Sequence, residues 1–219
     1  MILSFVIFHC SFSFAHNTDS VYNGTQIKLD IASPVLIPAI YQWQMQQYEV
    51  AANVRLAKRW YPTLELGYGG GSTSRGDTVF YSGQGGFFRV GCDLNPLKKH
   101  PEQPHALLVG VRLGTSVQQF DQTVHCTSVV NHVFVDNDLL MNRSGVYADC
   151  WGEIVAGCQV EIAKVNNTAF YMGWMGRFRC LFTRKTADDR NNPYPIYIPG
   201  FGKRDNIAWG ANYYLGWRF

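Results

Sequence analysis

Hydrophobic and polar residues alternate with a period of two along most of this chain, and long helical periodicity is scarce. In residues 107–117, one set of alternate positions is almost wholly apolar, whereas the other set includes glycine, serine and Arg112. Residues 146–162 and 170–182 show the same arrangement. A period of two places alternate side chains on opposite faces of a β-strand, and these segments exceed the five or six residues usual in globular sheets. The pattern therefore predicts an all-β protein whose long strands have one apolar and one mixed face.

Eight strands follow from this pattern, within a single domain over residues 16–219. We place them at about residues 25–33, 45–58, 62–70, 84–94, 105–120, 145–163, 168–183 and 207–219. The connections near 34–44, 71–83, 121–144 and 184–206 are long, and those between them are shorter. Long loops at one end and short turns at the other are typical of an antiparallel outer-membrane barrel.

The charged residues of these strands gather on the mixed faces, where acids and bases occur in equal number. The acids are Asp30, Glu49, Glu65, Asp93, Asp149, Glu153 and Glu161, and the bases are Lys28, Arg55, Arg89, Arg112, Arg177, Arg179 and Arg218. A soluble barrel would expose these faces to water, whereas a membrane barrel would turn them into its lumen, where charges must be paired. We favour the second arrangement. The predicted lumen charge network comprises Asp30, Glu49, Arg55, Glu65, Arg89, Asp93, Arg112, Glu153, Arg177, Arg179 and Arg218.

The amino-terminal residues 1–15 are predicted to be an export signal. A short apolar run precedes small residues at Ser13 and Ala15, and the run is too short to cross a bilayer as a helix. The remaining composition is rich in aromatic residues (15%) and poor in charge (16%), which excludes a disordered chain. With a net charge of +3 and no block of basic residues, we expect no nucleic-acid partner.

The final strand ends on Phe219, and Tyr213, Leu215 and Trp217 precede it at alternate positions. In this respect, and in its leader and loop pattern, the chain resembles bacterial outer-membrane β-barrel proteins of the small eight-stranded class. The resemblance covers the whole chain after the leader. It implies an eight-stranded antiparallel transmembrane barrel in the cell outer membrane, with short periplasmic turns, longer extracellular loops and outer-membrane lipids around it. It also implies that these four residues form the signal recognised by the assembly machinery.

Candidate chemistry is sparse. Lipid A deacylases of the outer membrane use a His-x-Ser pair, but here Thr127 follows His125 at that spacing and Ser128 comes one position later. A zinc site from His125, Cys126 and His132 would lack a fourth ligand. We therefore assign no catalytic, cofactor-binding or metal-ligating residue and expect no cofactor.

Three of the long loops are unusually apolar, and exposed apolar groups in loops mark interaction sites. The predicted partner-docking residues are Val35, Leu36, Ile37, Phe134, Leu139, Leu140, Tyr194, Ile196 and Tyr197. Two other interpretations are that the strands extend past the membrane and that the loops pack on one another.

The expected function is that of a non-enzymatic barrel, a subunit or anchor of a larger outer-membrane complex for barrel assembly or export. Its partners would be surface lipoproteins or another barrel. The alternatives are a lipid A deacylase-like enzyme and a stand-alone structural or adhesin barrel. A pore is disfavoured, because eight strands around a charge-filled lumen leave little open path.

Overall fold

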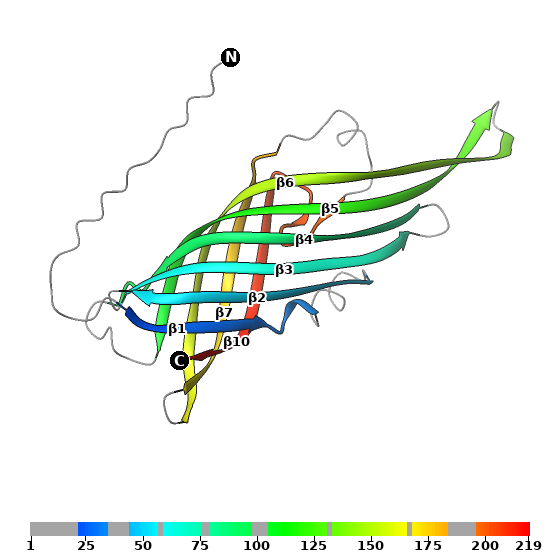
Figure 1. Ribbon diagram of the computed structural model, residues 1–219. Coiled ribbons are helices and arrows are strands. Elements are labelled where there is room, and N and C mark those ends of the chain that lie inside the picture. Colours follow the sequence, from blue (N-terminus) through cyan, green and yellow to red (C-terminus); the bar gives the residue numbers. More distant parts are fainter. Residues whose placement is uncertain are drawn as a thin grey trace, which may run out of the picture.

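A computed structural model describes residues 22–34, 44–56, 59–75, 79–97, 105–130, 133–165, 168–183 and 196–219. Eight strands form a closed antiparallel barrel in the order β1-β10-β7-β6-β5-β4-β3-β2 (Figure 1). Their bounds are Tyr22–Asp30 (β1), Gln44–Leu56 (β2), Trp60–Arg75 (β3), Val79–Leu94 (β4), Ala106–Val130 (β5), Val133–Val165 (β6), Thr168–Leu181 (β7) and Ile207–Arg218 (β10). The predicted all-β, eight-stranded antiparallel architecture is confirmed. The described residues include no helix long and apolar enough to span a membrane.

The strands are strongly staggered around the barrel. The paired residues can be followed once around the barrel, from Arg218 on β10 through β1 to β7 and back to β10. The path returns at Ala208, which is ten residues before its starting point. With a rise of ~3.3 Å per residue and ~4.8 Å between strands, this stagger tilts eight strands by about 40° from the barrel axis. The lumen is therefore just wide enough to be filled by side chains.

The polar faces of the strands point inward and the apolar faces point outward. Arg89, Asp93 and Asp149 are fully buried, whereas Leu113 and Val111 on β5 are more than half exposed. The outward positions of β5 from Leu107 to Val117 carry no charged side chain. This distribution is the reverse of that in a water-soluble barrel, where the apolar side chains fill the interior.

Glycines allow large side chains to fit inside this narrow lumen. A Cβ atom at Gly67 would lie 2.0 Å from Cζ of Phe87, and one at Gly114 would lie 2.3 Å from Cε2 of Trp151. Phe87 and Trp151 are both buried. Each large ring thus occupies space that a side chain at the facing position would fill.

Two predicted loops are instead continuations of strands. Residues 71–75 and 79–83 extend β3 and β4, and most of 121–144 forms the ends of β5 and β6, joined at 131–132. The prediction of a loop at 71–83 is wrong. The outward face of β3 and β4 becomes polar at Ser72, Ser82 and Gln84, so the apolar–polar alternation disappears from the sequence, but the two strands remain paired. We call the part of β5 and β6 beyond Val124 and Trp151 the β5–β6 arm; it projects from one end of the barrel (Figure 1).

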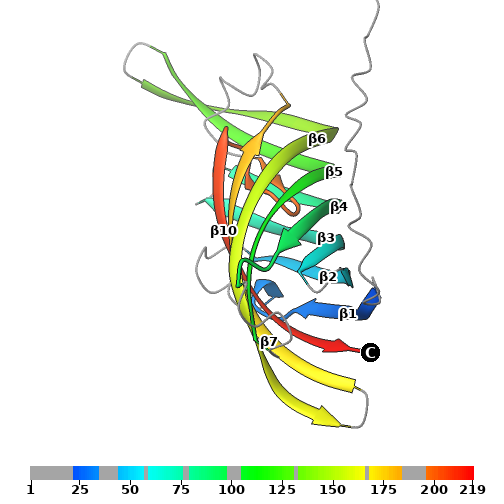
Figure 2. The ribbon, with the colours of Figure 1, turned by 90° about the vertical axis from the view of Figure 1, so that its left-hand side faces the viewer.

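A short hairpin lies inside the barrel, within the predicted fourth loop. It consists of β8 (Tyr197–Ile198) and β9 (Gly202–Lys203), joined by a turn in which Gly200 has a φ angle of 80°; Gly202, the first residue of β9, has a φ angle of 110°. Ile198 and Phe201 are completely buried, and Figure 2 shows this orange segment between the barrel walls. We call residues 196–204 the plug.

Candidate functional site

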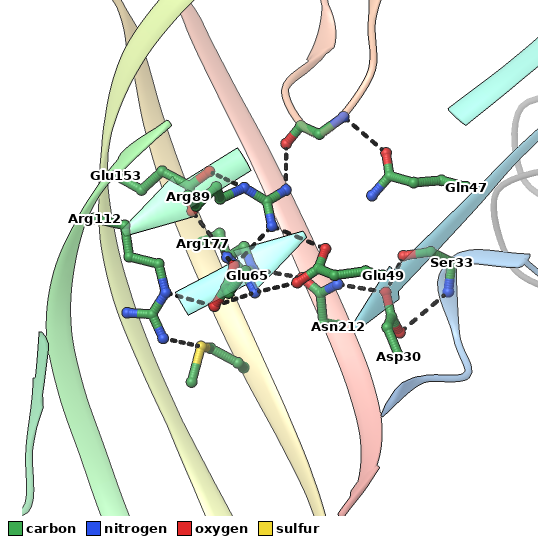
Figure 3. A network of polar contacts seen from close by, with 12 residues as sticks. Asp30, Ser33, Gln47, Glu49, Glu65, Arg89, Arg112, Glu153, Arg177 and Asn212 are labelled. Carbon is green, nitrogen blue, oxygen red and sulfur yellow. Dashed lines mark hydrogen bonds and ion pairs between the residues drawn. The ribbon is translucent and has the colours of Figure 1, made fainter. Parts of the chain in front are cut away.

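The middle of the lumen contains a layer of ion pairs contributed by six strands. Arg177 of β7 is its hub (Figure 3). Its guanidinium nitrogens lie 3.0 Å from Glu49, 2.9 Å from Glu65 and 2.9 Å from Glu153, and its Nε donates to Asn212 at 2.6 Å. All five side chains are buried. One cation thus joins carboxylates from β2, β3 and β6.

Three further arginines belong to the layer, and one of them, Arg179, lies 3.4 Å from Glu153. Arg89 lies 2.8 Å from Glu49, 2.8 Å from Glu65 and 3.0 Å from Glu153. Arg112 lies 2.6 Å from Glu65 and binds Asp93 through two parallel hydrogen bonds of 2.6 and 2.9 Å. The planar guanidinium group suits such multiple contacts with carboxylates.

The strand register explains why these charges meet. Glu65 on β3 pairs directly with Arg89 on β4, and Glu153 on β6 stands between Arg112 on β5 and Arg179 on β7. Opposite charges at neighbouring inward positions compensate one another where water is excluded. A shift of one residue in register would turn these charges outward, so the network also favours the correct strand pairing.

The outer members of the predicted network lie at the margins of this layer, and Asn212 links one of them, Asp30, to Arg177. Asp30 ends β1 and accepts hydrogen bonds from the Ala32 amide at 2.9 Å and from Ser33 and Asn212. Arg218 lies 3.6 Å from Glu161, and both side chains are partly exposed. Arg55 is buried near the end of β2. The structure therefore groups Glu49, Glu65, Asp93 and Glu153 with the four arginines 89, 112, 177 and 179.

The plug rests on this layer. Arg89 donates to the Gly200 carbonyl at 2.6 Å, and Arg179 donates to the Phe201 carbonyl at 2.8 Å. The Gln47 side-chain oxygen accepts from the Gly200 amide at 3.0 Å, as Figure 3 shows. The same arginines thus serve both the carboxylates and the backbone of the plug.

Contacts near the mouth of the barrel also hold the plug. Arg204 lies 3.1 Å from Asp149 and its guanidinium carbon lies 4.4 Å from the centre of the Tyr147 ring. Phe201 packs edge-on against Trp151, with 5.7 Å between ring centres. The sequence pattern did not predict the plug. Its signal was the apolar run from Ile196 to Phe201 around Pro199 and Gly200, of which Ile196 and Tyr197 were predicted to dock a partner.

The predicted docking residues Ile196 and Tyr197 must therefore be corrected. Both are buried in the plug, packed with Tyr81 and Phe120, because the loop folds back into the barrel. Phe134, Leu139 and Leu140 belong to β6 in the β5–β6 arm, and their side chains lie outside the described part of the structure. The predictions at Val35, Leu36, Ile37 and Tyr194, and the leader 1–15, also fall outside the described residues.

The predicted assembly signal lies on the barrel's outward surface. Leu215 and Phe219 are exposed, and Tyr213 and Trp217 are half-buried. The Phe219 amide donates to the Thr25 carbonyl at 3.0 Å, and the Thr25 amide donates to the Phe219 carbonyl at 3.3 Å. The last residue thus takes part in closing the barrel against β1.

Of the side chains weighed for catalysis, only that of His125 lies in the described part of the structure. His125 lies on β5 and contacts the edge of the Phe80 ring, with 5.8 Å between ring centres. The side chains of Thr127 and Ser128 are not described, and the β5–β6 register shifts between Cys126 and Ser128. Among the described side chains, no group of three His, Cys, Asp or Glu residues could hold a metal ion.

A small cavity adjoins the ion-pair layer. Its volume is about 20 Å³, and Lys28, Glu49, Thr63 and Tyr214 are among its lining residues. Such a volume suits about one water molecule, which needs two to four polar partners. The geometry at this level therefore supports a filled, rigid lumen rather than a binding pocket for an organic ligand.

Comparison with known proteins gives a family but no activity. No curated protein matches the chain. A family model described as a domain of unknown function, DUF6048, matches residues 1–218. Because this match spans nearly the whole sequence, the chain belongs to the DUF6048 family.

Proposed function

We propose that the protein is a non-enzymatic integral outer-membrane barrel that serves as a subunit or anchor of a larger outer-membrane complex. The observation that carries the proposal is the inside-out arrangement of the barrel. Exposed Trp174 and Val109 face outward, while Arg177 and Glu153 are buried in the lumen. Within the closed part of the barrel every strand pairs with a neighbour on both sides, which satisfies its backbone hydrogen bonds as a bilayer requires.

The height of the apolar surface agrees with a membrane. On β5 the outward apolar positions run from Leu107 to Val117. Ten residues at ~3.3 Å each, tilted by about 40°, span about 25 Å along the barrel axis, which is the usual height of the apolar band of such barrels. Exposed aromatic rings such as Trp60 and Trp209 lie near strand ends, where interfacial aromatic residues are expected.

The β5–β6 arm favours a role in assembly over that of a simple membrane plug. From Val124, the last residue that pairs with β4, β5 continues for six residues to Val130, a length of about 20 Å along the strand, and among the described strands it pairs there with β6 alone. An isolated two-stranded hairpin is only marginally stable in water, so such an arm is best explained by a partner that covers it. Surface lipoproteins or another barrel would be suitable partners.

Membrane insertion is tested first, with the full chain expressed in a Gram-negative host. We expect the protein in the outer-membrane fraction, soluble only in detergent, and migrating faster on gels before boiling than after. Recovery of a folded, detergent-free monomer from the soluble fraction would contradict insertion.

Assembly is tested by extraction in gentle detergent followed by native gel electrophoresis and mass spectrometry. We expect a complex well above the 24.8 kDa of the chain. A chain that always migrates alone, even after crosslinking in intact cells, would contradict the role as a subunit.

A further inference from the structure

A closed barrel removes the free edges of its sheet, but β6 regains one by running beyond its neighbour. Within the described part of the chain, the ladder between β6 and β7 ends at the pair Trp151–Leu181, whereas β6 continues to Val133. On its other side, β6 pairs with β5 as far as Val130. The stretch of β6 before Trp151 thus has one side on which no described strand pairs with it.

The backbone groups on that side can be identified. The Cys150 amide donates to Thr183 Oγ at 2.8 Å and its carbonyl accepts from the Phe182 amide at 2.9 Å, so both groups point toward β7. The Asp149 carbonyl accepts from Thr115 on β5 at 3.2 Å and therefore points the opposite way. By the alternation of a strand, the amides and carbonyls of Ala148, Val146 and Ser144 lie on the β7 side.

The stretch 144–148 contains no proline, no bulge and no charged side chain, and the inward-pointing charges Arg143 and Asp149 flank it on either side. Natural edges carry prolines, bulges or inward-pointing charges, or are very short. No proline occurs from 133 to 165, and the register shifts of β6 lie outside 142–149. The side chains of Ser144, Val146 and Ala148 are uncharged and exposed, Val146 to 69%.

We propose that the β6 edge at residues 144–148 pairs with an extended strand of a partner protein, which adds to the sheet through main-chain hydrogen bonds. The inference rests on the proposed function and specifies how its partner binds. Because Val146 and Ala148 flank the edge on the outward face, the partner strand should be neutral and apolar on that face.

A segment of the same chain is a poorer occupant. Residues 184–195 follow β7 in the sequence and are the nearest candidates, but they include Pro193 and Pro195 and five charged residues. Proline cannot donate to a ladder, and charged segments have low strand propensity. A second copy of this chain is the remaining competitor, and the experiment separates it from a different partner.

The test places a photo-crosslinking amino acid at position 146 of the full chain in intact cells. We expect one adduct with a different protein, mapped by mass spectrometry to an extended segment. Ser144→Pro removes an amide from the edge and leaves the β5 ladder intact, so the adduct should fall about tenfold. Ser144→Thr keeps the amide and is the matched control. Should Ser144→Pro not fold, Ala148→Lys places a charge beside the same edge and should have the same effect.

An adduct between two copies, a crosslink to residues 184–195, no adduct at all, or an adduct unchanged in Ser144→Pro would each overturn the inference. The proposed function is judged separately. If the native complex persists without a partner crosslink at position 146, only the strand-addition inference fails. If the inserted barrel forms no complex, the role as a subunit fails as well.

Discussion

Arg177 shows at the scale of single residues how charged side chains fill the interior of this barrel. Its guanidinium contacts three carboxylates within 3.0 Å, and each of those carboxylates also contacts Arg89. A buried charge is costly alone, but such a shared network compensates each charge more than once. Removing one member should therefore disturb several others.

Glu153→Gln tests this coupling, because the substitution keeps the shape of the side chain and removes its charge. Glu153 lies between Arg89 (3.0 Å), Arg177 (2.9 Å) and Arg179 (3.4 Å), which would be left with too few anions. We expect a loss of about 3–5 kcal/mol in the free energy of unfolding, measured by urea titration of the barrel in detergent.

Glu161→Gln is the matched control, since Glu161 pairs with Arg218 at 3.6 Å and both side chains are partly exposed. It should change the free energy of unfolding by less than ~1 kcal/mol. Equal effects of the two substitutions would show that the central layer is not a coupled network.

Gly114 tests the packing of rings against glycine. A Cβ atom there would lie 2.3 Å from the buried Trp151 ring, so Gly114→Ala should cost about 1–3 kcal/mol of unfolding free energy. At Gly86 the nearest atom to an added Cβ is 3.8 Å away, and Gly86→Ala should be close to neutral. Tryptophan fluorescence during urea unfolding measures both, and a neutral Gly114→Ala would contradict this packing.

At the scale of elements, period-two alternation was sufficient to predict the eight barrel strands. The alternation failed to predict the ends of strands where the outward face changes from apolar to polar. Beyond Tyr68 on β3, outward residues such as Ser72 are polar, so the pattern fades although the backbone pairing continues. The charges of the lumen layer were predicted from their shared face, but their partners depend on register across strands, which a single sequence does not reveal.

The plug was missed for a different reason. Ile198 and Phe201 show that a loop is apolar, but not which surface covers it. A docking loop and a loop folded into its own barrel have the same composition. Only the contacts of Gly200 and Phe201 with Arg89 and Arg179 distinguish the two cases.

The docked plug should protect its own backbone from proteolysis. Trypsin cleaves after Lys203 and Arg204, and local unfolding of the plug must come first. Replacing both Ile198 and Phe201 with alanine removes two fully buried side chains, so the folded variant should be cut there much faster than the wild type.

Ile207→Ala is the control for this proteolysis, because Ile207 follows the plug on β10 and is 53% exposed. Its cleavage rate, followed by mass spectrometry of the fragments, should equal that of the wild type. Equal rates for all three proteins would show that these contacts do not hold the plug.

At the scale of the whole molecule, the lumen is closed at two levels. The plug fills the part nearest the β5–β6 arm, and the ion-pair layer lies beneath it. The two levels share Arg89, yet the layer also has contacts that do not involve the plug, such as Arg112 with Glu65 at 2.6 Å. The layer should therefore persist when the plug is absent.

This arrangement predicts that the protein does not conduct ions, even without its plug. In planar bilayers we expect no current steps from the wild type, and none from a variant in which residues 196–204 are replaced by a glycine-serine linker. The reason is that an eight-stranded barrel is only wide enough for its side chains, and the buried arginines and carboxylates remain in place. Conductance in the wild type would overturn the view of a filled lumen. Conductance confined to the linker variant would show that the plug, and not the ion-pair layer, closes the barrel.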